Sequence, residues 1–368
     1  MRASTQILNV QMLRALAAVM VVAGHAGEEM RVIAAAGGRS ALSMNGLNWG
    51  WGVDVFFVIS GFIMIATSAD RFGKPGAARE FFVRRLIRIV PLYWLTTTLL
   101  LVGAFISARY LNVPVGEWPH IAASYLFIPD LRPSGEVRPV LALGWTLNYE
   151  MFFYVFFALA MLAPLRRGVL ALFALFGLLA AIGAFGPFGQ TQIDFWTSPL
   201  LLEFLLGVAI GLGSRNGWQV SGAAAFAMFV AGFALYVFLG PAWRLDEIIP
   251  QFLRAGVPAA LLVAAGVFGP DAPRARLWAA VGIIGDASYA LYLVHPFAIR
   301  PLRHFWIESM GFAPPALYFA VALSCALAAA LALHFLVETP LTRALNNFRA
   351  RRRQQRLGSG AMQAHAAE

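Results

Sequence analysis

The sequence predicts an all-α integral membrane protein with about ten transmembrane helices. Hydrophobic residues make up 60% of its 368 residues, charged residues make up only 12%, and the mean hydropathy is +0.71. A soluble domain has roughly 45–50% apolar and about 25% charged residues, so this composition excludes a soluble globular fold. The apolar residues also gather in long runs, and a helix of about 20 residues crosses a hydrocarbon core of about 30 Å.

Ten apolar segments have the length of a transmembrane helix. We expect them near residues 9–26, 49–67, 88–108, 142–163, 168–186, 197–213, 218–239, 251–269, 277–297 and 315–337. The segment 118–128 is apolar but short and is bounded by Pro119 and Pro129, which predicts an interfacial or re-entrant element. The first segment is similar to a signal peptide but carries Arg14 inside its apolar run, so we expect it to be retained as a transmembrane helix.

Basic residues predict the orientation in the membrane. Positive charge in short loops favours the cytoplasmic side, and most of the 28 Lys and Arg residues would lie inside if the N-terminus is inside. An even number of spans then places the C-terminus inside as well. We therefore expect a multi-pass protein of the cytoplasmic (inner) membrane, with a transmembrane domain over 1–342 and a basic, disordered cytoplasmic tail over 343–368. The tail favours contact with anionic lipid over nucleic acid, because no aromatic-rich soluble domain accompanies it.

Ionisable side chains within the apolar segments are candidates for function, because a charge at membrane depth costs about 3 kcal/mol or more. In the first helix, Arg14 and His25 are eleven residues apart. That spacing gives about three turns, a rise of about 16 Å and nearly the same helix face. The predicted orientation places Arg14 near the inner end of the helix and His25 near its outer end, so both could contact one molecule.

The run GVDVFFVISGFIM, residues 52–64, places Asp54 at the outer start of the second helix, at the depth of His25. A carboxylate there could hold the imidazole in one tautomer and stabilise its protonated form. A helix N-cap is the alternative role for Asp54, and both stay open. Ser60 is turned away from Asp54, whereas Gly61 would allow another helix to approach closely.

A cluster of arginines opens the third helix in FFVRRLIRIVPLYWL, residues 81–95. Arg84, Arg85 and Arg88 lie on one side of that helix, and guanidinium groups bind phosphate through paired hydrogen bonds. Together with Arg14 they predict a binding site for a phosphate-bearing cytoplasmic cofactor. A positive-inside anchor is the alternative.

Other polar residues favour structural roles. His334 and Glu338 are one helical turn apart, which predicts a local ion pair, and Glu203 could bridge two helices. The six histidines are scattered without ligand spacing, so no metal site is expected. Cys325 is the single cysteine, which excludes an intramolecular disulfide.

Six motifs occur in order between residues 14 and 340. They are Arg14 with ten residues before His25, GVDVFFVISGF, the RxxR pair Arg85 and Arg88, WTLNYE at 145–150, SYALYLVH at 288–295 and ETP at 338–340. Through these motifs the chain resembles the membrane acyltransferase 3 family, the multi-pass O-acyltransferases of surface and exported polysaccharides. Within that family it is most similar to exopolysaccharide O-acetyltransferases of the rhizobial type.

The resemblance implies transfer of an acyl group, most commonly acetyl, from cytoplasmic acetyl-CoA to a hydroxyl of an exopolysaccharide or lipid-linked glycan at the outer face. The residues expected to bind CoA are Arg14, Arg84, Arg85 and Arg88, and those expected in catalysis are His25, Asp54 and Glu150. Further candidates for binding substrate or for structure are Trp145, Asn148, Tyr149, Ser288, Tyr292 and His295, of which the first three could also stabilise an oxyanion. The expected partners are acyl-CoA, the glycan acceptor, the bilayer and polysaccharide biosynthesis machinery.

Two catalytic routes stay open for His25, which could act as a general base or carry the acyl group itself. The absence of a serine or cysteine nucleophile motif favours the general base. Two other classes of protein also remain. A transporter could use a proton relay through Arg14, His25, Asp54, Glu150 and Asp286, although that function leaves the RxxR cluster unexplained. A non-catalytic partner in glycan export would not need a CoA-sized basic site.

Overall fold

The computed structural model describes residues 2–40, 48–106, 116–239, 249–272, 275–310 and 313–351. Within these residues the chain is helical, apart from its loops and one isolated β-bridge between Leu131 and Val137. The α-helices are α1 (Arg2–Ala36), α2 (Trp51–Ser68), α3 (Ala77–Ile106), α5 (Trp118–Tyr125), α6 (Trp145–Ala160), α7 (Leu165–Gly183), α8 (Thr191–Trp196), α9 (Leu201–Arg215), α10 (Gly222–Phe238), α11 (Val257–Phe268), α12 (Arg276–Asp286), α13 (Ser288–Ser309) and α14 (Pro315–Leu333). Two short 3₁₀ helices, η1 (Ala69–Arg71) and η2 (Ala142–Gly144), and two π-helices, η5 (Phe252–Gly256) and η6 (His334–Glu338), complete the set.

All ten segments predicted as transmembrane spans coincide with helices in the described residues. Six of the helices described are long and apolar enough to cross a membrane, or seven if the bent pair α12 and α13 forms one span. Helix α10 and the continuous helix Phe252–Phe268 are apolar but shorter. The chain is therefore an all-helical, multi-pass membrane protein, while the count of ten spans and the orientation stay predictions. Helix continues past η6 to Arg351, and the rest of the predicted tail lies outside the described residues.

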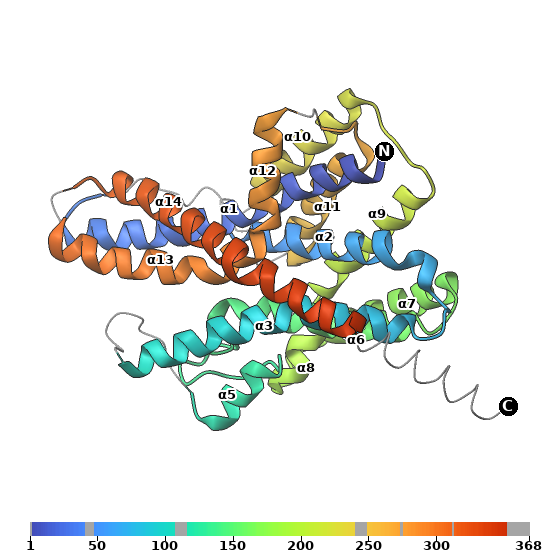
Figure 1. Cartoon of the computed structure of the whole chain (residues 1–368), viewed down its shortest axis with the longest axis horizontal. Coiled ribbons are helices and arrows are strands. Elements are labelled where there is room, and N and C mark those ends of the chain that lie inside the picture. The colour runs from blue at the N-terminus through green and yellow to red at the C-terminus, as the bar shows by residue number, and fades with distance from the viewer. Residues whose placement is uncertain are drawn as a thin grey trace.

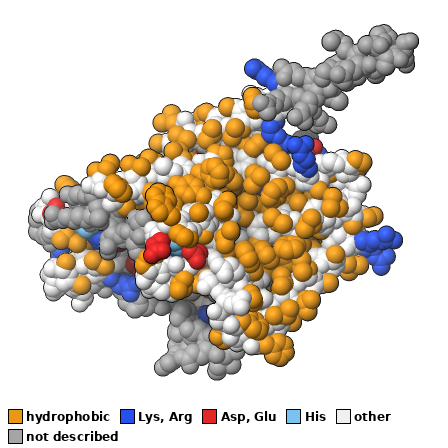
Figure 2. All heavy atoms as spheres, turned by 90° about the horizontal axis from the view of Figure 1, so that it is seen from below, with side chains coloured by type: hydrophobic (Ala, Val, Ile, Leu, Met, Phe, Trp, Pro, Cys, Tyr) orange, Lys and Arg blue, Asp and Glu red, His pale blue; other side chains and the backbone are white. Residues whose placement is uncertain are grey.

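Apolar side chains also cover the outside of the protein. Figure 2 shows hydrophobic atoms across most of one face, with Lys and Arg side chains near its edges. Phe105 on α3, Leu170 on α7 and Phe226 on α10 expose 97%, 60% and 69% of their surface. Water would penalise so much exposed apolar surface, whereas lipid tails solvate it. The surface therefore agrees with an integral membrane protein.

Helix α1 extends beyond the predicted span 9–26. Its packing face consists of residues that recur every three or four positions and are buried against α13 and α14, namely Ala18, Val22, Ala26, Met30 and Ile33. Figure 1 shows the three helices running alongside one another at one end of the molecule. Because this packing continues to Ile33 and α1 ends only at Ala36, His25 lies within the helix, and its predicted place near the helix end was wrong.

The predicted span 277–297 was wrong as a single helix, because it is broken between α12 and α13. The two helices meet at a bend of 70°. Gly285, in the last turn of α12, lies so close to α1 that a Cβ would overlap the backbone carbonyl of Gln11. This contact packs α12 tightly against the first half of α1, while α13 turns to run beside the second half.

Helix α2 lies at the centre and packs closely against α9. Gly61 on α2 faces the carbonyl of Phe204, and Gly207 on α9 faces the carbonyl of Val58, so a side chain at either glycine would overlap backbone. The close approach predicted for Gly61 is confirmed. Nearly all of α2 is buried as a result, and its residues Val53 and Ser60 face the interior of the bundle.

Candidate active site

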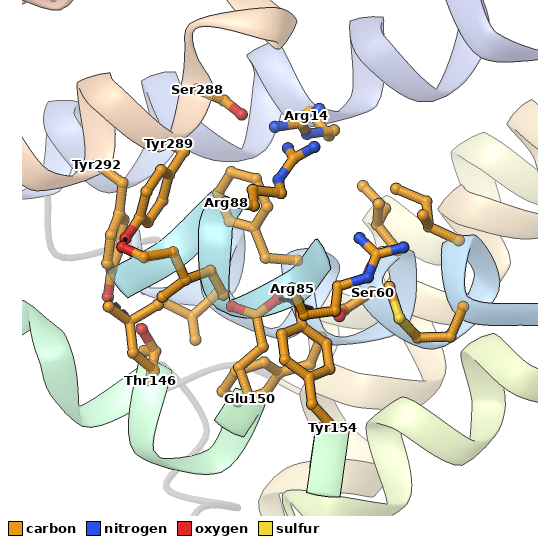
Figure 3. Close-up of a pocket in the computed structure, with 18 residues that line it drawn as sticks. Arg14, Ser60, Arg85, Arg88, Thr146, Glu150, Tyr154, Ser288, Tyr289 and Tyr292 are labelled. Atoms are coloured by element: carbon orange, nitrogen blue, oxygen red, sulfur yellow. Dashed lines mark hydrogen bonds between the residues drawn. The ribbon is translucent and has the colours of Figure 1, made fainter. Parts of the chain in front are cut away.

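A small cavity of about 100 Å³ lies between α1, α2, α3, α6 and α13. We call it the arginine cavity, and its polar lining residues are Arg14, Ser60, Arg85, Arg88, Thr146, Glu150, Tyr154, Ser288, Tyr289 and Tyr292. Figure 3 shows Arg14 and Arg88 close together on one side, and Arg85 beside Glu150, Ser60 and Tyr154 on the other. Five helices, of which three are consecutive and two come from later in the chain, thus supply one charged site.

Helix α3 presents two of its three clustered arginines to this cavity. Arg85 and Arg88, three residues apart, both line it. Arg84 instead lies 3.4 Å from the carboxylate of Glu80. Of the three arginines in the predicted cluster, Arg84 is therefore the one that does not line the cavity, and its part in binding the donor stays a prediction.

Arg14 is buried in the wall of the arginine cavity, where a chain of side-chain hydrogen bonds holds it in place. Its guanidinium donates a 2.8 Å hydrogen bond to Gln11 Oε1, and Gln11 Nε2 donates one of 2.5 Å to Asp286 Oδ1. Among the described residues, no ion pair joins Arg14 directly to a carboxylate. The charge of Arg14 is thus oriented through an amide and remains available to an anion.

Glu150 is the carboxylate of the arginine cavity and is held on one oxygen. Both the Ser60 hydroxyl, at 3.1 Å, and the Tyr154 hydroxyl donate to Glu150 Oε1. The guanidinium of Arg85 lies 5.8 Å from the centre of the Tyr154 ring. The sequence patterns did not predict either hydroxyl as a partner of Glu150: Ser60 was considered only as a partner of Asp54, and Tyr154 was not singled out, although its spacing of one turn from Glu150 is a usable signal.

A second cavity, of about 610 Å³, lies further along α1. We call it the histidine cavity, and its lining includes His25, Glu28, Arg31, Asn48, Trp49, Val53, Asp54, Arg138, Leu143, Trp145, Tyr236, Gln251, Arg254 and Tyr292. Arg14 and His25 therefore line neighbouring cavities, one each, as their shared helix face predicts. Val53 and Tyr292 line both cavities, so the two adjoin at these side chains.

His25 is stacked on a second histidine. The rings of His25 and His295 have centroids 5.1 Å apart, and His25 Nδ1 lies 3.7 Å from Glu28 Oε2. His295 is fully buried, with Nδ1 3.1 Å from the carbonyl of Leu291. A carbonyl only accepts hydrogen bonds, so Nδ1 carries the proton and Nε2 is left as an acceptor. His295 is thereby fixed in one tautomer against one face of His25.

Asp54 lines the histidine cavity but has other partners than His25. Its Oδ1 accepts a 3.0 Å hydrogen bond from Gln251, and its carboxyl group lies against that of Glu203. No hydrogen bond or ion pair joins Asp54 to His25 in the part of the chain described, so the predicted pairing was wrong. The N-cap role is not observed either, because Gly50 caps α2 and Asp54 lies in its first turn.

The chain is similar to known proteins over most of its length. A family model described as an acyltransferase domain matches residues 7–335. The chain belongs to this acyltransferase family. It is 38% identical over 297 residues to the exopolysaccharide production protein ExoZ of Rhizobium meliloti, which covers 79% of this chain and 89% of ExoZ. It is 28% identical over 337 residues to the acyltransferase MdmB of Streptomyces mycarofaciens, covering 81% and 82% of the two chains. No solved structure matches the chain significantly.

The resemblance to membrane acyltransferases is thus confirmed, and the enzyme class replaces the transporter and export-partner alternatives. In this acyltransferase the remaining predicted site residues lie in different places, some lining one of the two cavities and others outside both. Trp145 lines the histidine cavity, and Ser288 and Tyr292 line the arginine cavity. Tyr292 is fixed because its hydroxyl lies 3.0 Å from both the Leu143 carbonyl and the Thr146 hydroxyl.

Two predicted residues of α6 lie outside both cavities. Tyr149 stacks on Phe195 of α8, with ring centroids 3.9 Å apart, and the amide oxygen of Asn148 is buried without a hydrogen-bond partner among the described residues. The helical repeat turns these two side chains away from the face of Thr146 and Glu150.

The expected local pair of His334 and Glu338 is confirmed at 2.7 Å.

Proposed function

We propose that this acyltransferase moves an acetyl group from cytoplasmic acetyl-CoA to a hydroxyl of an exopolysaccharide or lipid-linked glycan at the outer face of the inner membrane. The observation that carries the proposal is the pair of adjoining cavities on α1, with Arg14 in one and His25 in the other. A donor and an acceptor on opposite sides of a bilayer need a path of this kind. The name of the relative ExoZ, an exopolysaccharide production protein, supports a glycan acceptor.

The arginine cavity suits an anionic donor. Arg14, Arg85 and Arg88 face a single carboxylate, Glu150, so positive charge is in excess. Guanidinium groups bind phosphates through paired, charge-assisted hydrogen bonds. A volume of about 100 Å³ is too small to enclose a nucleotide. We therefore place the CoA phosphates at the mouth of the cavity and the narrow pantetheine arm inside it.

The arm would run along α1 from Arg14 to His25. The rise between the two residues is about 16 Å, which is comparable with the length of an extended pantetheine arm. Val53 and Tyr292, where the cavities adjoin, would then flank the thioester. The predicted orientation, with the N-terminus inside, places the arginine cavity towards the cytoplasm and the histidine cavity towards the outer face.

His25 is suited to act as the general base. Its side chain is 43% exposed, and the nearby Glu28 carboxylate would stabilise the protonated ring. The acceptor hydroxyl gives its proton to His25 as its oxygen attacks the thioester carbonyl carbon. A C–O bond forms and the C–S bond breaks, after which the proton passes to the thiolate and CoA leaves as a thiol. In the alternative route the imidazole attacks first and carries the acetyl group to the hydroxyl.

The other site residues would position these groups. Glu150, held by Ser60 and Tyr154, would orient Arg85 towards the donor, a role different from acid or base catalysis at the acceptor. Among the candidates for the oxyanion site, Trp145 alone lines the histidine cavity, and its indole N–H is a suitable donor.

The test is acetyl transfer by purified protein reconstituted in liposomes, with radiolabelled acetyl-CoA and a glycan extract. The His25→Ala variant should bind acetyl-CoA with unchanged affinity and transfer no label, because it keeps the arginine cavity but lacks the base. His304→Ala is the matched control, since His304 lines neither cavity, and it should retain both properties. Retained transfer by His25→Ala would remove His25 from the mechanism.

A further inference from the structure

Positive charge is also in excess in the histidine cavity, where the acceptor would bind. Three arginines from three different parts of the fold line it, Arg31 on α1, Arg138 in the segment before α6 and Arg254 in η5. The carboxylates that line it are Glu28 and Asp54. The lining therefore contributes one more cationic side chain than anionic side chains, in a site that is partly shielded from water.

The nearest partners of the cavity's carboxylates are not its arginines, although Glu28 also interacts electrostatically with Arg31 and Arg138, and Asp54 with Arg254. Glu28 faces His25 at 3.7 Å, and Asp54 accepts from Gln251 and lies against Glu203. Among the described residues no ion pair within 4 Å joins Arg254 to Asp54. Arg138 is 3.7 Å from Glu136, but that contact is on the exposed loop, with 58% of the Glu136 side chain in solvent. Water screens such a pair strongly.

The local backbone structure positions Arg254 at the wall of the histidine cavity. It lies in the π-helix Phe252–Gly256, and π-helical turns are rare and frequently occur at functional sites. The Trp51 indole donates a 2.9 Å hydrogen bond to the Ala255 carbonyl in this turn. Arg254 Nε is buried and has no hydrogen-bond partner in the part of the chain described. A buried donor without a partner is costly, so an anion that approaches it would be stabilised.

Aromatic side chains and size favour a sugar as the molecule that carries this anion. Trp49, Trp145 and Tyr236 line the same cavity, and the guanidinium of Arg138 lies over the Trp145 ring at 6.0 Å. Flat aromatic rings pack against the C–H faces of sugars, while amides such as Gln251 bond their hydroxyls. The volume of about 610 Å³ is within the usual range of ligand sites.

We propose that the acceptor carries a carboxylate or phosphate on, or next to, the sugar that is acylated, and that Arg254 and Arg138 bind this anionic group. The inference rests on the proposed function and specifies its acceptor. It makes Arg254 and Arg138 residues that determine acceptor specificity, at a distance from the donor site around Arg14.

The test uses three soluble probes of matched size: methyl glucuronoside, glucose 1-phosphate and methyl glucoside. Binding to the purified protein is measured without donor by saturation-transfer NMR, and acetyl transfer to each probe is measured with radiolabelled acetyl-CoA. At least one anionic probe should bind tenfold or more tightly than the neutral glucoside. The uronoside distinguishes a carboxylate site from a phosphate site.

Variants assign the preference to the residues. In Arg254→Gln and in Arg138→Gln the ratio of anionic to neutral affinity should fall towards one, and Arg254→Lys should keep part of it. Arg215→Gln is the matched control, because Arg215 pairs with Asp70 outside the cavity, and it should leave the ratio unchanged. Acetyl-CoA binding by each variant confirms that it is folded, and Arg138, in an irregular segment, is the variant least disruptive to the fold.

The outcomes separate the inference from the proposed function. Equal binding of neutral and anionic probes, no saturable binding of either anionic probe, or a preference that survives both Gln variants would overturn the inference. Acetyl transfer to the neutral glucoside as efficient as to the anionic probes would overturn it while supporting the function. An anionic preference without any acetyl transfer from acetyl-CoA would leave the anion site standing and contradict the function.

Discussion

Side-chain direction decides which arginines can contact a ligand. Arg85 and Arg88 line the arginine cavity, whereas their neighbour Arg84 pairs with Glu80 at the surface. All three contribute charge to the same helix end, so if their role is to orient the protein in the membrane, substituting any one of them should have a similar effect. If they bind phosphate, substitutions of Arg85 and Arg88 should have larger effects than substitution of Arg84, because only a guanidinium that lines the cavity can form hydrogen bonds with acetyl-CoA.

We therefore expect Arg85→Ala and Arg88→Ala each to weaken acetyl-CoA binding by about 1–3 kcal/mol, the usual contribution of a charge-assisted hydrogen bond. Arg84→Ala should change the affinity by less than about 0.5 kcal/mol, as expected for an exposed pair. Calorimetric titration of correctly inserted protein measures all three. Equal effects of the three substitutions would mean that general positive charge, rather than a defined site, attracts CoA.

At the scale of elements, the close pair α2 and α9 holds the wall shared by the two cavities. Val53 and Ser60 on α2 line the cavities, and Gly61 and Gly207 allow the backbones of the two helices to touch. Because the glycines face backbone carbonyls, an added methyl group has no flexible side chain to displace. Helix α2 would have to move, and with it the junction of the cavities.

Gly61→Ala and Gly207→Ala should each lower the free energy of unfolding by about 1–3 kcal/mol, the usual cost of overpacking. Thermal unfolding in detergent measures the loss. Gly177→Ala on α7 is the matched control, since nothing lies within 4 Å of its added Cβ, and alanine favours helix over glycine by about 1 kcal/mol. A loss of stability in the control equal to that at Gly61 would contradict the account of tight helix contact.

Across the whole molecule, hydropathy located the helices, and helical spacing predicted that Arg14 and His25 share a face of α1, along which they line adjoining cavities. Both signals are local. The break at Ala287 was missed, since it depends on Gly285 touching the backbone of α1. The partner of Asp54 was also missed, because Gln251 comes from a helix 197 residues away. Ser60 was set aside for facing away from Asp54, yet that direction brings it to Glu150. Contacts between distant segments were thus the part that sequence patterns left undetermined.

The central claim is that one donor molecule reaches from Arg14 to His25. It is tested by His25→Cys in a Cys325→Ser background, where the new thiol is the only one in the chain. An impermeant thiol reagent is added outside sealed vesicles, and acetyl-CoA is added inside. Acetyl-CoA should shield the cysteine from labelling, and the further change Arg14→Ala should raise the concentration needed about tenfold or more, the equivalent of about 1.4 kcal/mol. Equal labelling with and without acetyl-CoA, in protein shown separately to bind it, would contradict the claim, because the thioester would then not reach His25.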